Sequence, residues 1–402
     1  MYQLMDVAPD EWRFQKWFAH SLDLQELFSQ AVNYYSSGYD YIPDMPLTNE
    51  QRIKNKSFAS KKFKHLNSCA RHLEYKLGVN NALYLSSAFF CRDRLCLICN
   101  WRRRLKYSYK LYQSIYPYSK DYNLLFFTFT APNVPLRLLS LSITRLHYAF
   151  NYLFGYSDRI PKSYRGKGLI NIPKYALGSF RTVEVTRRCT GFKQKAIDAK
   201  GSCYNKGCSV PPYGLDYHPH LHAVVIVDKN LDFIPHNCFN TSNNHNWVSL
   251  WTQALIKAKY PCNLNNLQEG YNKNNPEWLA NCSVSLINKR NYDDSKIKKG
   301  IWETSKYGFE PMSFMFDRKL NWFNPYIQSV HLTEFAVQIH NRRFLVTNGC
   351  LRGCVSDNQN ENLVSIKDSD NKLFGESVFF KWNKRETSYC VLNEDSNIIS
   401  FL

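Results

Sequence analysis

Hydrophobic and polar positions alternate in several short segments of the chain, a pattern that predicts β-strands. These segments are residues 124–130, residues 180–186, an apolar run at 223–227 that follows three alternating histidines, and residues 343–346. Successive side chains of a strand point to opposite faces, so each segment can pack one face against a core.

Two other segments have helical periodicity. Residues 136–154 carry an apolar side, and residues 247–259 form a second amphipathic stretch. The apolar side of the first segment consists of Leu138, Leu139, Leu141, Leu146 and Phe150. Strands with helices inserted between them, and few strand–helix–strand repeats, predict an α+β fold built on an antiparallel sheet.

Charge is spread unevenly along the 402 residues. The chain has a formal net charge of +19, yet residues 1–50 contain eight acidic and two basic residues, whereas residues 51–110 contain fifteen basic and two acidic residues. A basic block of this kind predicts a polyanionic partner, and nucleic acid is the interpretation that we favour. The predicted DNA contacts are Arg92, Arg94, Arg102, Arg103, Arg104 and Lys106.

The composition shifts predict four parts. They are an acidic N-terminal lead at 1–50, a basic cysteine-containing unit at 51–116, a large domain at 117–352, for which the family resemblance given below implies a catalytic role, and a C-terminal tail at 353–402. No apolar run approaches the ~18 residues of a membrane span, and no secretory signal is evident. We therefore expect a cytoplasmic protein without a membrane partner.

The basic unit contains a zinc-like cysteine motif. Cys96-x-x-Cys99 has the spacing of one corner of a tetrahedral zinc site, with His65 and His72 as rival ligands. The predicted structural zinc ligands are Cys69, Cys91, Cys96 and Cys99. Thirteen cysteines in a chain without a leader favour metal ligation over a disulfide framework. A second metal corner at Cys203 and Cys208 remains an open alternative.

The segment His218-Pro219-His220-Leu221-His222 leads into the apolar strand. His220 and His222 lie two residues apart and share one face of a strand, so both imidazoles can hold one divalent metal ion. Glu184, on the strand at 180–186, is a candidate third ligand if the two strands pair. His218 competes for that position, although we expect Pro219 to interrupt the ladder there.

Residues 301–308 contain a second group of candidate residues. Helical spacing places Glu303 and Tyr307 on one face, next to Lys306. A tyrosine is a poor nucleophile at neutral pH unless a cation or a metal-bound phosphate favours the phenolate. A carboxylate one turn away could activate water.

Together these motifs resemble the rolling-circle plasmid replication initiators of the HUH endonuclease superfamily. The similarity runs in order along about residues 65–352. It comprises the cysteine unit ending at Arg103, Phe127-Thr128-Phe129-Thr130, Glu184-Val185-Thr186, His220-Leu221-His222, Ser305-Lys306-Tyr307, and Arg342-Arg343-Phe344 with Gly349.

The resemblance implies a central antiparallel sheet with helices packed on it and the histidine pair on a middle strand. It implies that Tyr307 attacks a phosphate of single-stranded or hairpin origin DNA, that His220, His222 and Glu184 hold Mg²⁺ or Mn²⁺, and that Glu303 activates water. The products would be a 5′-phosphotyrosine and a 3′-hydroxyl that primes synthesis. Because the chain has no phosphate-binding loop of the helicase type, a host helicase and polymerase are implied partners.

Two features depart from the family pattern. Glu310 and Pro311 stand where relatives often carry a lysine after the tyrosine, and the segment 187–217 is long. Three other functions remain open. They are a transposase of the same superfamily, a non-catalytic zinc-containing copy-number regulator, and a metal-dependent hydrolase that does not use Tyr307.

Overall fold

The computed structural model divides the chain into two compact units, each assembled from separate stretches of sequence. Unit 1 contains residues 1–109, 321–334 and 358–402, and unit 2 contains residues 110–320 and 335–357. The structure describes residues 3, 12–37, 47–77, 83–157, 159–166, 168–169, 176–189, 215–229, 247–262, 280–287, 294–306, 325–355, 363–364 and 374–392.

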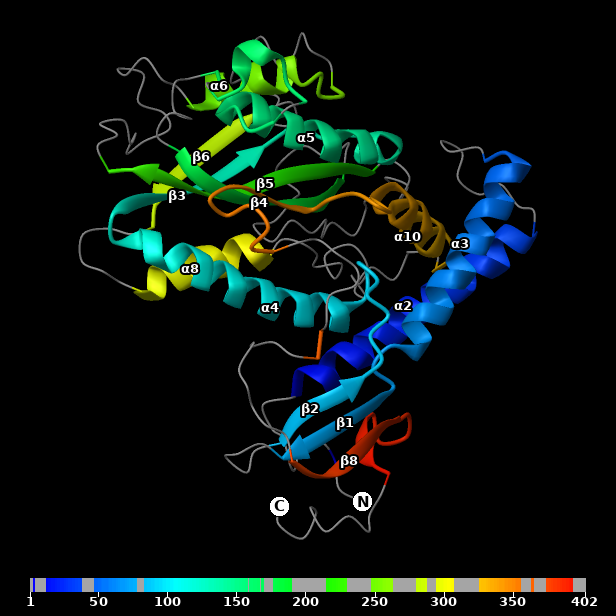
Figure 1. Cartoon of the computed structure of the whole chain (residues 1–402). Coiled ribbons are helices and arrows are strands. Elements are labelled where there is room, and N and C mark those ends of the chain that lie inside the picture. The colour runs from blue at the N-terminus through cyan, green and yellow to red at the C-terminus, as the bar shows by residue number, and fades with distance from the viewer. Residues whose placement is uncertain are drawn as a thin grey trace. The chain divides into compact units, whose positions relative to one another are not determined.

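Unit 2 is built on a five-stranded antiparallel sheet with the strand order β6-β3-β5-β4-β7 (Figure 1). Its strands are β3 (Tyr122–Thr130), β4 (Ala176–Cys189), β5 (Leu215–Asp228), β6 (Asn281–Leu286) and β7 (Leu345–Gly349). The antiparallel sheet and the α+β class agree with the prediction from the sequence. The histidine strand β5 is the central strand, so both of its edges are paired.

Apolar side chains of β3 cover one face of this sheet. Phe127 and Phe129 are fully buried, and their rings contact Trp247 and Trp251 with centroid separations of 5.0 and 4.6 Å. Helices α5 (Leu139–Phe154) and α6 (Trp247–Lys257) supply this layer, and Gly155, with φ of 73°, ends α5 in the left-handed conformation. Because strand residues alternate, Thr128 and Thr130 lie on the opposite face.

Helix α8 (Asp294–Lys306) packs on that opposite face. Thr182 of β4 donates a hydrogen bond from its hydroxyl to the carbonyl oxygen of Thr304 at 2.6 Å. Both residues are buried, so the C-terminal turn of α8 is fixed against the face of the sheet that carries the polar residues.

Pro219 does not interrupt the pairing of β5 with β4, contrary to our expectation. The register runs continuously through Thr186–His218, Val185–Pro219 and Glu184–His220. Tyr217 exchanges both backbone hydrogen bonds with Val134, at 2.9 Å each. Alternate residues of a strand direct their backbone groups toward the same neighbouring strand, so the backbone nitrogen of Pro219, like that of Tyr217, is directed toward the β3 side. Pro219 lies just beyond the end of β3, so its missing N–H removes no hydrogen bond from the ladder.

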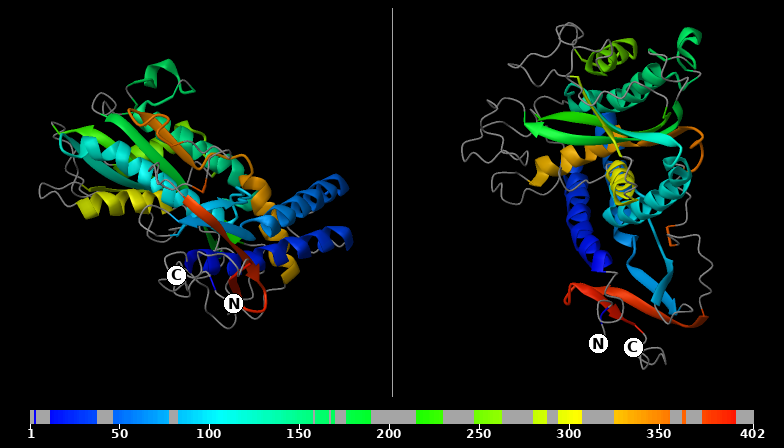
Figure 2. Two further views of the ribbon diagram at one scale, coloured as in Figure 1. Left: turned by 60° about the horizontal axis from the view of Figure 1, so that its bottom comes forward. Right: turned by 90° about the vertical axis from the view of Figure 1, so that its left-hand side faces the viewer.

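Unit 1 contains a second antiparallel sheet with the order β2-β1-β8-β9. Its strands are β1 (His72–Leu77), β2 (Leu83–Ala88), β8 (Phe374–Asn383) and β9 (Ser388–Val391). Strand β8, in red, pairs with β1, in light blue (Figure 2). The prediction of an appended tail at 353–402 is therefore wrong for residues 374–391, which complete this sheet.

Helices α2 (Trp12–Ser37) and α3 (Asn49–Ser68) belong to unit 1, and α4 (Leu97–Ile115) begins there. Helix α3 starts at a capping box, in which the Thr48 hydroxyl accepts from the Gln51 backbone N–H and the Gln51 side chain accepts from the Thr48 N–H. The buried rings of Phe18, Trp382 and Tyr389 pack together in the core of this unit.

The remaining α-helix among the described residues is α10 (Pro325–Ile339). None of the helices in the described parts of the chain is long and apolar enough to cross a bilayer.

Candidate functional site

The structure brings His220, His222 and Glu184 together on the polar face of the sheet of unit 2. Glu184 lies directly opposite His220 in the β4–β5 register. The Nε2 atom of His222 donates to Oε2 of Glu184 at 3.0 Å, because a carboxylate can only accept. His222 is buried, whereas Glu184 and His220 are partly exposed, so the group is open on one side.

Each of these histidines also contacts a threonine of β3. The Oγ1 atom of Thr128 is hydrogen-bonded to Nδ1 of His222, and Oγ1 of Thr130 to Nδ1 of His220, at 3.2 Å in both cases. The threonines lie directly opposite these histidines in the register of β3 and β5. Reasoning from the sequence identified this strand but assigned no role to its hydroxyl groups.

His218 lies at the end of the same row. Its ring centroid is 4.2 Å from that of His220, and its Nδ1 is hydrogen-bonded to Oδ1 of Asn133. The His220 and His222 ring centroids are 6.3 Å apart. His218 is buried, so it lies behind the more exposed His220 rather than in the opening of the site.

The candidate residues at 303–307 are described only in part. Glu303 is half-buried on α8, and Lys306 is the last residue of that helix. Tyr307, the side chain of Lys306, and the departures at Glu310 and Pro311 lie outside the described residues, as do Cys203 and Cys208.

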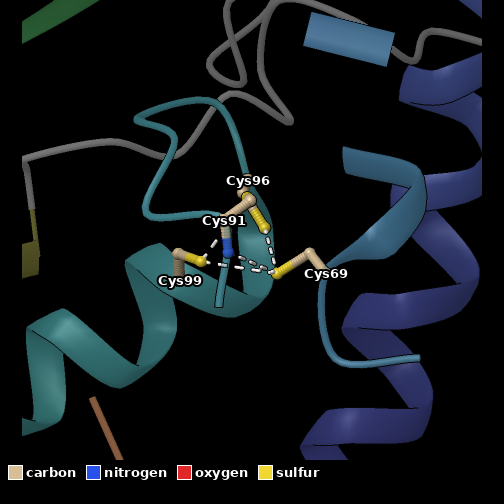
Figure 3. Close-up of side chains that lie close together, drawn as sticks. All are labelled: Cys69, Cys91, Cys96 and Cys99. Carbon is tan, nitrogen blue, oxygen red and sulfur yellow. Dashed lines mark hydrogen bonds between the residues drawn. The ribbon is translucent and has the colours of Figure 1, made fainter. Parts of the chain in front are cut away.

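The second cluster consists of four cysteines in unit 1. The sulfur atoms of Cys69, Cys91, Cys96 and Cys99 all lie within 4.8 Å of one another (Figure 3). Three of the separations are 3.5, 3.5 and 3.7 Å. A zinc ion bound tetrahedrally at about 2.3 Å from each sulfur requires separations of about 3.8 Å, so the cluster could hold this ion.

Each ligand comes from a defined point of the fold. Cys69 caps the C-terminus of α3, Cys91 follows β2, and Cys96 and Cys99 lie at the start of α4. The backbone N–H of Arg92 donates to the sulfur of Cys99 at 3.2 Å. Among the described residues the cluster contains neither His65 nor His72, which are both exposed.

The pKa values of the four cysteine thiols favour the binding of a metal cation. Burial raises the pKa of the Cys99 thiol well above its ordinary value. Burial opposes ionisation of Cys96 as well, but hydrogen bonds from the thiols of Cys69, Cys91 and Cys99 outweigh it and lower the pKa of Cys96. One thiolate therefore forms readily, and more than one requires a positive ion among the sulfurs.

The predicted DNA contacts divide into exposed and buried residues. Arg92 is exposed, and Arg94, Arg103 and Arg104 are half-buried. Arg102 and Lys106 are buried, with exposed fractions of 3% and 6%. The guanidinium of Arg102 lies over the rings of Phe14 and Trp101 and donates to the carbonyl oxygen of Leu363 at 2.9 Å. The expectation that both residues belong to an exposed basic surface is therefore wrong.

Helix α3 carries exposed lysines that the prediction did not single out. Lys54, Lys61 and Lys64 are exposed and lie on its outer side, opposite the buried Asn55 and Ala59. Their spacing of seven and three residues places them on one face of a helix. We call this set the α3 lysine face. The sequence signal that could have found it is the absence of acidic residues between 51 and 68.

An ion pair links α3 to the cysteine loop. Lys62 is paired with Asp93, and the Oδ1 atom of Asp93 accepts a hydrogen bond from the backbone N–H of Leu95 at 2.9 Å. Both side chains of the pair are largely buried. Lys62 is thus a structural lysine, whereas the α3 lysine face is exposed.

Comparisons with known proteins agree with the resemblance that the motifs indicate. The family model described as "Replication protein", Rep_1, matches residues 82–390. The chain belongs to this family of replication proteins, which confirms the similarity to rolling-circle plasmid replication initiators.

Individual relatives extend this similarity. The chain is 24% identical to "Protein rep" of Streptococcus pneumoniae serotype 2 over 82% of this chain and 84% of that protein. It is 25% identical to "Protein rep" of Lactiplantibacillus plantarum over 85% and 94%, and 29% identical to "Protein rep" of Bacillus amyloliquefaciens over 51% and 49%. No solved structure matches the chain.

Proposed function

We propose that this replication protein initiates rolling-circle replication of a plasmid by nicking one DNA strand at the double-strand origin. The observation that carries the proposal is the grouping of two imidazoles and one carboxylate on one open face, with His222 and Glu184 3.0 Å apart. Two neutral imidazoles and a carboxylate suit a divalent ion such as Mg²⁺ or Mn²⁺ and leave positions for phosphate oxygens. When bound, this ion would polarise the scissile phosphate.

Tyr307 is the proposed nucleophile. It follows Lys306, the last residue of α8, and the preceding turn is fixed by the hydrogen bond between Thr182 and Thr304. Thr182 lies opposite His222 in the register, so the last described turn of α8 is fixed next to the strand that carries the histidines. The phenol gives up its proton to solvent, its oxygen bonds to phosphorus, the bond from phosphorus to the 3′ oxygen breaks, and that oxygen takes up a proton from solvent.

The products of this step are a 5′-phosphotyrosine and a free 3′-hydroxyl. A host polymerase extends the 3′ end while a host helicase opens the duplex. Lys306 favours the phenolate of Tyr307 by its charge. Glu303, one turn before the tyrosine, accepts a proton from water when the phosphotyrosine is hydrolysed at the end of the cycle.

Unit 1 supplies the DNA-binding surface in this proposal. The four cysteines would hold Zn²⁺, and the bound ion would tie α3, the loop at 91–96 and the start of α4 to one another. The exposed Arg92 and the α3 lysine face then present positive charge to the phosphates, with Arg94, Arg103 and Arg104 near the loop. Arg102 and Lys106 are buried and are not part of this surface.

A covalent-adduct assay tests the proposed reaction. Single-stranded DNA from the candidate origin is incubated with the full chain and Mn²⁺, and the products are separated on a denaturing gel. We expect a DNA adduct with the wild type that is absent from Tyr307→Phe, and peptide mass spectrometry should place it on Tyr307. His220→Ala should also abolish the adduct while it retains DNA binding.

Other outcomes separate the rival functions. DNA binding without any adduct would favour a copy-number regulator, and metal-dependent cleavage that survives Tyr307→Phe would favour a hydrolase. Adduct formation on transposon-like ends, with none on the origin, would favour a transposase. The family match supports the initiator over the transposase.

A further inference from the structure

The hydroxyl groups of β3 make the same contact with both histidines of the candidate metal site. Thr128 is hydrogen-bonded to Nδ1 of His222, and Thr130 to Nδ1 of His220, each at 3.2 Å. The two threonine–histidine pairs are two residues apart along the strands and have the same hydrogen-bonded geometry. The contacts lie on the polar face of the sheet, away from the packed rings of Phe127 and Phe129.

We propose that Thr128 and Thr130 are positioning residues that hold the two imidazoles in the orientation needed to bind a divalent ion. This inference rests on the proposed function, because it concerns the metal site proposed there. A metal-bound histidine nearly always donates its other ring N–H to an acceptor, which fixes the plane of the ring. The threonine oxygens are placed to accept that hydrogen bond from Nδ1.

A hydroxyl group suits this task because it can both donate and accept. Without a metal ion, Nε2 of His222 carries the proton and donates to Glu184, so the hydroxyl of Thr128 donates to Nδ1. With an ion on Nε2, the proton would be carried by Nδ1 and the same hydroxyl would accept. The hydroxyl can thus keep its contact with the ring in both states.

The neighbouring residues support a specific arrangement rather than a general preference for threonine in strands. His218, the third histidine of the row, is hydrogen-bonded through Nδ1 to Asn133, just beyond the end of β3. Each of the three histidines therefore has an oxygen partner at Nδ1 from β3 or the residues that follow it. Ser283 of the edge strand β6 lies opposite Thr128 but is exposed, and it offers a matched control.

The experiment measures the affinity of the full, zinc-loaded chain for Mn²⁺ by calorimetry and by electron paramagnetic resonance. Thr128→Val and Thr130→Val keep the shape of the side chain but remove the hydroxyl. We expect each to weaken Mn²⁺ binding by about 10- to 100-fold, as is typical for the loss of a hydrogen bond that orients a ligand. The serine variants Thr128→Ser and Thr130→Ser should restore most of the affinity, and Ser283→Ala should leave it unchanged.

Adduct formation gives a second readout. At saturating Mn²⁺ the valine variants should recover most of the wild-type adduct, because the ligands themselves remain. Valine variants that bind Mn²⁺ as tightly as the wild type, or serine variants as weak as the valine variants, would overturn the inference. His220→Ala and His222→Ala separate the two proposals. If they lose Mn²⁺ but the valine variants do not, only the role of the threonines fails, and if they also keep it, the proposed metal site fails.

Discussion

The α3 lysine face leads to a quantitative prediction for DNA binding. The change is the triple substitution Lys54→Gln, Lys61→Gln and Lys64→Gln, which removes three exposed charges from one side of α3. The buried residues of the helix and its capping box are untouched. We therefore expect the fold and the zinc content to stay unchanged while phosphate contacts are lost.

The magnitude follows from counterion release. Each phosphate contact contributes about 0.9 to the slope of log affinity against log salt on duplex DNA and about 0.7 on a single strand, so three contacts contribute about 2.7 or about 2.1. Between about 50 and about 200 mM salt, the wild-type protein should lose roughly 20- to 40-fold more affinity than the triple variant.

The assay is fluorescence anisotropy of a labelled origin oligonucleotide at a series of KCl concentrations. A matched control removes three exposed charges elsewhere in unit 1 by the substitutions Lys381→Gln, Lys384→Gln and Arg385→Gln. The control should keep a slope close to that of the wild type. Equal slopes for the two triple variants would refute the reasoning, because a general effect of net charge would then explain the salt dependence.

Three further predictions concern the structure around the two sites. Cys96→Ser should lower the bound zinc and the melting temperature together, and a variant that keeps one zinc per chain by atomic absorption would contradict the assignment of this ligand. Arg102→Met should lower the free energy of unfolding by about 1–3 kcal/mol because the carbonyls of Leu363 and Val364 lose their donor. The slope of log DNA affinity against log salt should not change, and a flatter slope would show that Arg102 contacts DNA. Burial and the charge of Arg181 lower the pKa of His147 to about 3. Below pH ~6.5 the unfolded chain therefore protonates His147 while the folded protein does not, and the free energy of unfolding falls as the pH drops. For this partly exposed ring the loss should be about 1–2 kcal/mol between pH 6.5 and 5, and urea unfolding of His147→Gln should show a smaller loss over that range.

The polar face of the sheet in unit 2 was predictable because strand periodicity determines it. The side chains of His220, His222 and Glu184 were assigned to faces from a period of two, and the pairing of β4 with β5 places them together as expected. The β3 hydroxyls follow the same period, but a threonine in a strand is so common that the sequence alone gave no reason to assign one a role.

Burial of charged residues was not predictable in the same way. The run Arg102 to Lys106 looks uniformly solvent-facing in the sequence, yet the stem of a long basic side chain can pack on apolar groups. In Arg102 even the guanidinium is buried, over the rings of Phe14 and Trp101. The contact with Phe14 joins segments far apart in the chain, which local patterns do not report.

The location of β8 and β9 has a consequence for how the protein is made. Strand β8 lies between β1 and β9 in the sheet of unit 1, and residues 73 and 380, separated by some three hundred positions, are paired. Contacts so distant in sequence form slowly, since a long loop must close before they are made. The sheet cannot be completed on the ribosome until residues 374–391 have been synthesised. A transcript or chain cut short before that point yields a β1–β2 hairpin without its partners, so the cell obtains a finished unit 1 only from messages translated through β9.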